Sequence, residues 1–369
     1  MADGRIRVLV ADDSPTIVAF MEDALGADPA IEVVGIARNG REAVDMAASL
    51  KPDIITMDIV MPRMDGLAAT QLIMGQTPTP IIVISSCIDP EEQTITLNAL
   101  NAGAVAALAK PTEIFGTDGD AFRNVLLTHV RQFCRVKVRS QPVASGTPAL
   151  KLPGPAPALA APRAKSPYQV IAVGASVGGP TALFNFVAHF PPSFALPIVV
   201  VQHIAPGLLP TLTAWLHEST GRLVEIAQEG EAVVGRSILF APDGTHLTLT
   251  ENLKVHLTDD PPVGDKKPSI DVLFRSLATS LGPKAVGVLL SVVGGDGPGG
   301  LGALKAAGAK TFAQDESSSV IVGTGPARPE LAIADYVLPP GQIARQIGQL
   351  VRGEEAVASP IPGPVSPIR

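Results

Sequence analysis

Acidic, hydroxyl and basic side chains follow the apolar runs in the first third of the chain. Asp12 and Asp13 follow IRVLV, Asp58 ends DIITMD, Ser85 ends PIIVIS and Lys110 follows AVAALA. Three carboxylates can bind Mg²⁺, which prefers hard oxygen ligands, and one of them can also accept a phosphoryl group. A nearby hydroxyl and lysine can then bind the phosphoryl oxygens and move the loops that carry them. The pattern therefore predicts a phosphorylation switch.

A single aspartate at the end of a strand can have a simpler role. Asp13 precedes Ser14 and Pro15, and alone it would fit the N-cap of a helix that begins there. Five suitable residues at successive strand ends favour the switch over five unrelated caps.

A second set of residues lies in the C-terminal half of the chain. Ser176 lies in GASVGGP directly after the apolar run QVIAV, on a strand-to-helix turn that matches GxSxG. The glycines permit a tight turn, and the start of a helix offers free N–H groups to a developing oxyanion. His203 follows IVVVQ, and Asp296 follows AVGVLLS in a glycine-rich loop. These types can supply a nucleophile, its base and an orienting carboxylate.

Each member of this second set has an alternative explanation. A glycine-rich turn after a strand can also bind a phosphate or a dinucleotide, although the GxGxxG spacing is missing. Asp296 alone would fit a turn former or an N-cap. His246 and His256 are weaker candidates for the base. Three other histidines fall in predicted helices, where a surface or core role is expected: His129, His189 and His217.

Both sets require parallel strands, because the carboxyl ends of such strands meet at one edge of a sheet. Short β-rich runs alternate with helical segments over residues 5–135 and again over 168–352. In the second region the expected helices lie at about 179–189, 208–219, 269–281 and 299–308. The predicted fold is α/β in two domains, a parallel five-stranded sheet and a doubly wound, mainly parallel sheet.

Two segments lack this alternation. Residues 136–167 are rich in proline and alanine and predict a linker, and residues 353–369 predict a disordered tail. The order Ser, His, Asp also differs from that of α/β-hydrolases, in which the acid precedes the histidine.

Composition excludes several classes of protein. The net charge is −7 and no block of Lys or Arg recurs, which argues against nucleic-acid binding. We found no signal region and no apolar run of about 20 residues, so the sequence predicts a cytoplasmic protein without membrane insertion. Cys87 and Cys134 have no CxxC partner, as expected in a reducing compartment.

The first domain resembles response-regulator receivers, which have a flavodoxin-like fold. The resemblance rests on Asp12-Asp13, on Asp58 followed by MPRMDG at 61–66, on Ser85-Ser86 and on Lys110-Pro111. It implies that Asp58 is the phospho-acceptor, that Asp12, Asp13 and Asp58 hold Mg²⁺, and that Ser85 and Lys110 form the switch. Val60 stands where related esterases often carry an acidic residue. The metal is expected to use the backbone carbonyl there.

The second domain resembles the chemotaxis protein-glutamate methylesterases, the CheB family, through GASVGGP, QHIAP, GGDG and AQDESSSVIVG. The resemblance implies Ser176 as nucleophile, His203 as general base and Asp296 as its orienting residue. It also implies an oxyanion hole of backbone amides near Val177 and Val293, and no cofactor for ester hydrolysis. Three segments depart from the family pattern: Val177, Val292-Val293 and Thr324-Gly325-Pro326.

The expected function is a phosphorylation-activated hydrolase in chemotaxis adaptation. It would remove methyl esters from glutamyl residues of methyl-accepting chemoreceptors and deamidate specific receptor glutamines, with a chemotaxis histidine kinase as phosphodonor. The first alternative is a catalytically weakened, receiver-linked signalling adaptor. Two others are a DNA-binding response regulator, which the acidic charge disfavours, and a small-molecule carboxylesterase.

Overall fold

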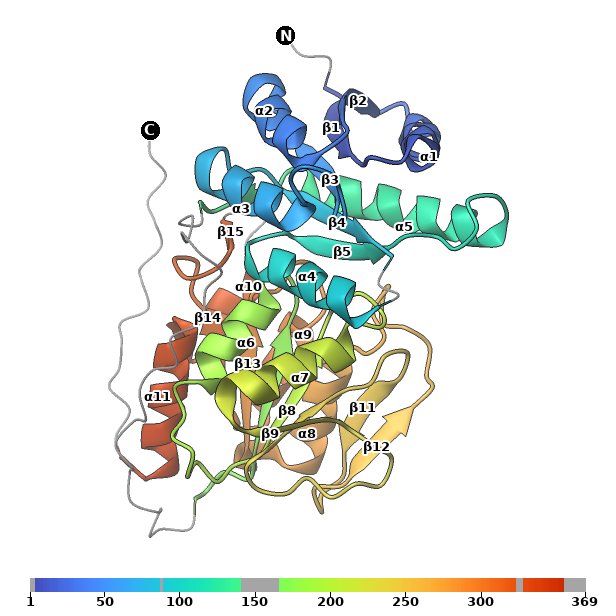
Figure 1. The fold of residues 1–369 in the computed structure, drawn as a ribbon. Coiled ribbons are helices and arrows are strands. Elements are labelled where there is room, and N and C mark those ends of the chain that lie inside the picture. Colours follow the sequence, from blue (N-terminus) through green and yellow to red (C-terminus); the bar gives the residue numbers. More distant parts are fainter. Residues whose placement is uncertain (1–3, 87–88, 141–165, 323–327, 355–369) are drawn as a thin grey trace. The chain divides into compact units, whose positions relative to one another are not determined.

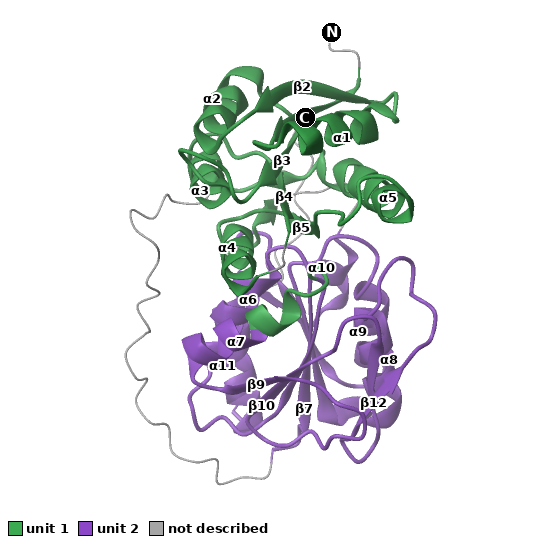
Figure 2. Ribbon diagram, turned by 45° about the vertical axis from the view of Figure 1, so that its right-hand side comes forward, with its two compact units in different colours: residues 1–150, 204–212, 319–326 green, residues 151–203, 213–318, 327–369 purple. Residues whose placement is uncertain are grey.

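The computed structural model describes residues 4–86, 89–140, 166–322 and 328–354 (Figure 1). The chain divides into two compact units (Figure 2). Unit 1 comprises residues 1–150, 204–212 and 319–326, and unit 2 comprises residues 151–203, 213–318 and 327–369. Most of the predicted linker, nearly all of the predicted tail, Cys87 and the segment Thr324-Gly325-Pro326 lie outside the described residues. The predicted domain boundaries stay predictions.

Unit 1 contains a parallel sheet with the strand order β2-β1-β3-β4-β5 in the described residues. Its central strands β3 and β4 are buried along their whole length, as expected of parallel strands that helices cover on both faces. This confirms the fold class expected for the first domain. The strand bounds are β1 (Ile6–Ala11), β2 (Ile31–Ala37), β3 (Ile54–Asp58), β4 (Ile81–Ser85) and β5 (Ala106–Ala109).

Side-chain caps fix where several helices of unit 1 begin. Ser14, Asn39, Asp65 and Asp89 each accept a hydrogen bond from a backbone N–H in the first turn of the helix that follows. The N-cap of the first helix is therefore Ser14, which leaves the carboxylate of Asp13 at the strand end. The helices are α1 (Pro15–Gly26), α2 (Gly40–Leu50), α3 (Gly66–Gln76), α4 (Pro90–Asn101) and α5 (Thr117–Phe133).

Segments distant in the sequence complete unit 1. The short strand β6 (Lys137–Val138) pairs antiparallel with β15 (Ile321–Val322). Leu208, five residues after His203, is fully buried in the hydrophobic cluster of this unit, together with residues of β3 and β4. The chain that follows His203 thus belongs to unit 1.

Unit 2 contains a larger parallel sheet with the order β16-β14-β13-β7-β8-β10-β9 in the part of the chain that is described. From β7 the chain first forms β8, β9 and β10 on one side, with β10 between β8 and β9, and then forms β13, β14 and β16 on the other. The predicted doubly wound fold is confirmed. Ligands of such sheets bind where the strand order reverses, which here is between β7 and β13. The bounds are β7 (Val170–Ala175), β8 (Ile198–Gln202), β9 (Leu223–Ile226), β10 (Ser237–Phe240), β13 (Ala285–Leu290), β14 (Lys310–Gln314) and β16 (Tyr336–Leu338).

The predicted helices of the second half lie within two residues of their expected bounds. The hairpin of β11 (His246–Leu249) and β12 (Val255–Thr258) was not predicted, nor were the last two helices. No helix in the described ranges is both long and apolar enough to cross a membrane. The helices are α6 (Gly179–Val187), α7 (Leu209–Thr220), α8 (Ile270–Ser280), α9 (Pro298–Ala306), α10 (Pro329–Ile333) and α11 (Pro340–Val351), with a 3₁₀ turn at Gly282–Lys284.

Candidate functional site

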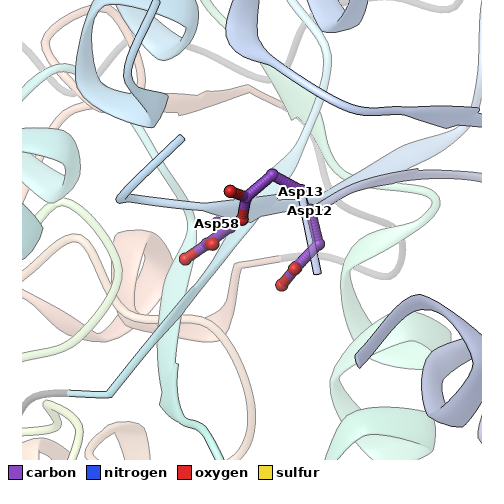
Figure 3. A group of neighbouring side chains, drawn as sticks. All are labelled: Asp12, Asp13 and Asp58. Atoms are coloured by element: carbon purple, nitrogen blue, oxygen red, sulfur yellow. The ribbon is translucent and has the colours of Figure 1, made fainter. Parts of the chain in front are cut away.

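Three carboxylates of unit 1 meet where β1 and β3 end (Figure 3). Asp12, Asp13 and Asp58 each offer an oxygen atom, and these atoms lie within 4.8 Å of one another. Asp12 and Asp58 are buried, whereas Asp13 is exposed. From the end of β5, the Nζ of Lys110 lies 3.1 Å from Oδ2 of Asp12 and 2.9 Å from Oδ2 of Asp58. The structure therefore brings together four of the five residues selected for the switch.

The charges of this cluster are not balanced. Burial raises the pKa of Asp58 to about 6, with a further contribution from the Asp12 carboxylate and against the opposing charge of Lys110. Burial lowers the pKa of the Lys110 ammonium, but the two carboxylates outweigh it and hold that pKa above its usual value. One ammonium thus faces three carboxylates. The excess negative charge and the hard oxygen donors fit a divalent cation such as Mg²⁺.

Ser85, the fifth residue, is hydrogen-bonded to helix α4. Its Oγ donates to Oε1 of Glu92 over 2.8 Å and accepts from Oγ1 of Thr96 over 3.0 Å. The same Glu92 oxygen accepts from the backbone N–H of Ser86 over 2.7 Å. Sequence reasoning did not select Glu92. Its position three residues after the N-cap Asp89 resembles a capping box, which would have suggested a local role at the helix start.

Ser176 lies at the tip of the strand at which the order of the large sheet reverses. It follows β7 directly, is 8% exposed, and is joined to α6 through Gly178, whose φ of +69° is in the left-handed region that favours glycine. The N–H of Gly179 donates to the carbonyl of Ser176 over 2.8 Å and closes the turn. Ala175 pairs with Gln202 in β8, so Ser176 and His203 occupy adjacent positions on neighbouring strands.

Gln202 links the backbones of the two residues. Its buried side-chain amide donates to the carbonyl of Ser176 over 2.9 Å and to the carbonyl of His203 over 2.8 Å. A Cβ on Gly179 would lie 2.1 Å from the Gln202 amide oxygen, so only glycine leaves room for this amide. Gln202 was not selected from the sequence, because its partners are backbone atoms that leave no residue pattern.

Replacing Gly179 by alanine is expected to lower the free energy of unfolding by about 1–3 kcal/mol, because the added methyl group overpacks the buried amide of Gln202. Urea unfolding of the purified chain measures this change. Gly295→Ala is the matched control, since a Cβ at Gly295 meets nothing within 4 Å. Equal stability of the two variants would contradict the close approach.

His203 contacts Asp296 across the end of the sheet. Its Nε2 lies 3.0 Å from Oδ2 of Asp296, but the pair does not have the geometry of a hydrogen bond. Within the described residues neither ring nitrogen has a hydrogen-bond partner, so the hydroxyl of Ser176 and the imidazole are not bonded in this structure. Catalytic hydrogen bonds of apo enzymes are often long and tighten when substrate binds.

The carboxylate of Asp296 is seated at the start of α8. Its Oδ1 accepts from the hydroxyl of Ser269 over 2.7 Å and from the N–H of Asp271 over 2.9 Å, and its Oδ2 accepts from the N–H of Ile270 over 2.8 Å. Burial raises the pKa of Asp296, but the contact with His203 and these donors have the larger, opposite effect. The pKa of Asp296 is therefore below its usual value. A charged Asp296 can stabilise an imidazolium.

The loops after β7 and β13 are bonded to each other. The hydroxyl of Ser291 donates to the carbonyl of Val177, and Ser291 itself has a φ of +43°. Val177 is buried, and Val292 packs against the core of unit 2. The backbone amides of Val177 and Val293 as oxyanion donors stay a prediction.

The other histidines have partners away from Ser176. His246 is fully buried, and His256 lies 3.1 Å from Glu229. The prediction that His189 lies in a helix was wrong by two residues, because α6 ends at Val187. The hydrogen bond of the His189 ring to the carbonyl of Asn185, 2.7 Å long, holds it at that helix end.

The fold and the two strand-end sites are typical of a receiver joined to a hydrolase domain with a doubly wound sheet. Residues 171–347 match the family model "CheB methylesterase", and residues 8–115 match "Response regulator receiver domain". The chain is 39% identical over 351 residues to the protein-glutamate methylesterase/protein-glutamine glutaminase 2 of Methanospirillum hungatei, covering 94% of this chain and 98% of that protein. It is 38% identical over 358 residues to the protein-glutamate methylesterase/protein-glutamine glutaminase 4 of Myxococcus xanthus, covering 97% of this chain and 100% of that protein.

A solved structure, the CheB methylesterase catalytic domain of Thermotoga maritima, is 32% identical, with a TM-score of 0.47, and covers 50% of this chain and 99% of that one. The chain belongs to the protein-glutamate methylesterase/protein-glutamine glutaminase family, known as CheB. The resemblance found in the sequence is confirmed, and with it the assignment as a methylesterase with a receiver domain. Phosphorylation of receivers depends on Mg²⁺ in general, and the phosphodonor is a kinase.

Proposed function

We propose that this chain hydrolyses glutamyl methyl esters of methyl-accepting chemoreceptors and deamidates specific receptor glutamines, under the control of phosphorylation of Asp58. Support for the proposal comes from two observations: Ser176 and His203 directly follow the paired strand residues Ala175 and Gln202, and Nε2 of His203 lies 3.0 Å from Oδ2 of Asp296. The names of the relatives supply the substrate class.

The proposed reaction begins when Oγ of Ser176 attacks the ester carbonyl and His203 takes its proton. Because Nε2 of His203 faces Asp296, Nδ1 is the nitrogen that remains for this proton. The negative charge on the carbonyl oxygen is stabilised by the N–H groups of Val177 and Val293. The bond from the carbonyl carbon to the methoxy oxygen breaks, and methanol leaves with the proton from His203. Water, deprotonated by His203, then attacks the acyl carbon; the bond to Oγ of Ser176 breaks, Oγ takes the proton from His203, and the glutamate is released. With a glutamine substrate, ammonia is the leaving group.

In unit 1 we propose that Asp12, Asp13 and Asp58 hold Mg²⁺, which when bound offsets the charge of the phosphoryl oxygens. Asp58 accepts the phosphoryl group, and Lys110 binds one of its oxygens. Ser85 would exchange its bond to Glu92 for another phosphoryl oxygen. Val60 is 60% exposed, so we expect that valine at this position does not displace the three carboxylates.

Contacts within unit 1 support a route by which a change at Asp58 could reach the backbone next to His203. Residues 204–212 begin directly after His203, and Leu208 is buried in the same hydrophobic cluster as β3, which ends at Asp58. A packed core has discrete arrangements, so a shift in this cluster can reach the backbone next to the base.

Methanol release from methylated receptor membranes, with and without a small-molecule phosphodonor, tests the proposal. The native chain is expected to be stimulated, whereas Asp58→Ala keeps its basal rate and does not respond, because it cannot be phosphorylated at position 58. Asp45→Ala, on the exposed face of α2, is the matched control and should respond as the native chain does. Stimulation of Asp58→Ala would contradict the switch.

Two alternatives predict other results in the same experiment. A signalling adaptor would release no methanol in any state. A small-molecule carboxylesterase would hydrolyse short-chain esters faster than methylated receptors.

A further inference from the structure

The hydroxyl of Ser269 makes two hydrogen bonds at the start of α8. It accepts from the N–H of Val272 over 3.3 Å as the N-cap of the helix, and it donates to Oδ1 of Asp296 over 2.7 Å. Ser269 is fully buried, so no water competes for either bond. Because the N–H of Val272 occupies the acceptor side of the oxygen, the O–H is directed at Asp296.

His246 holds the backbone of Ser269 from the other side. Its Nδ1 accepts from the N–H of Ser269 over 3.1 Å, and its Nε2 lies 3.2 Å from the carbonyl of Pro261. A nitrogen that accepts an N–H carries no proton, so the proton is on Nε2, which donates to Pro261. This fully buried histidine contacts neither Ser176 nor His203 through these bonds. Its role is to fix Ser269.

Asp271 binds the loop that carries Asp296. Its Oδ1 accepts from the N–H of Gly297 over 2.9 Å and from the N–H of Gly300 over 2.6 Å. The start of α8 therefore holds Asp296 directly and also holds the residue that follows it. The carboxylate that faces His203 has its position set by α8 as well as by its own loop.

We propose that Ser269, whose backbone N–H is held by His246, is a positioning residue for ester hydrolysis: its hydroxyl orients the Asp296 carboxylate toward His203. The proposal rests on the proposed function, in which Asp296 orients the base. A residue that only capped α8 would affect stability and leave the turnover number unchanged.

Ser269→Ala is expected to lower kcat for methyl-ester hydrolysis by about 10–100-fold with KM unchanged, since a hydrogen bond to a charged group is lost. Ser269→Thr keeps the hydroxyl and should restore kcat to within about threefold of native. Ser276→Ala is the same substitution on the same helix, without contact to Asp296, and should keep the native kcat. Thermal unfolding of each variant reports loss of the cap.

Ser269→Gly removes the same hydroxyl and costs the helix cap only a few tenths of a kcal/mol, so it gives the result if the alanine variant does not fold. Native kcat in either variant, or an equal loss in Ser276→Ala, would overturn the proposal. A threonine variant that folds but stays as slow as Ser269→Ala would overturn it too. Activity of Ser176→Ala in the same assay would instead show that the proposed function itself is wrong.

Discussion

Replacing Ser176 by alanine is expected to lower the rate of methanol release from methylated receptors by about 10⁴-fold or more, because loss of a serine nucleophile removes the covalent route altogether. The small residual rate would come from the oxyanion donors and substrate binding, which the substitution leaves in place. Methanol release with saturating phosphodonor is the measurement, so that the state of the receiver does not limit the rate.

The fold of this variant should be native. Alanine is smaller than serine, the turn is closed by backbone atoms, and the carbonyl that accepts from Gln202 remains. Phosphorylation of Asp58 should therefore proceed as in the native chain and serves as an internal control. A Ser176→Ala chain that keeps more than about a hundredth of the native rate would place the nucleophile elsewhere.

The architecture was predictable because of how parallel sheets bury their strands. β3 and β4 are buried on both faces, so their sequences are uninterrupted apolar runs, and the polar residue that ends each run marks the edge where sites form. Asp58 and Ser85 were found in this way. The same logic located Ser176, His203 and Asp296 at strand ends of the second sheet.

The supporting residues were not predictable from such patterns. Ser269 and Asp296 are 27 positions apart, and a hydrogen bond between them leaves no periodic signal. The sequence predicted a helix that starts at Ser269, but not what its cap would bind. His246 stayed a candidate base because the pattern of HLTL could not exclude it. The pattern does not show that the ring is buried or that both ring nitrogens have hydrogen-bond partners.

The switch hydroxyl shows the same limit in unit 1. The sequence placed Ser85 at the end of β4, but the direction of its hydroxyl depends on Glu92 and Thr96 of α4. Those contacts form only when the helix packs on the sheet. In the switch that we propose, contacts of Ser85 with the phosphoryl group would replace them.

Replacing Asp296 by asparagine is expected to lower kcat by about 10³–10⁴-fold, because the amide cannot stabilise an imidazolium and no longer holds the ring in the required tautomer. Asparagine offers one acceptor oxygen where the carboxylate uses two. The carboxylate accepts from Ser269, Ile270 and Asp271, so at least one of these donors loses its partner. We expect a loss of about 1–3 kcal/mol in the free energy of unfolding as well.

Urea unfolding and methanol release together separate the two roles of this residue. Asp260→Asn, an exposed residue, is the matched control and should change neither quantity. A loss of stability with native kcat would mean that Asp296 only caps α8. That result would be close to the alternative role of a turn former or N-cap. Loss of kcat in a chain that still folds would instead show that the charge of Asp296 supports His203. The same carboxylate contacts the start of α8 and His203, but only His203 takes part in the chemical step.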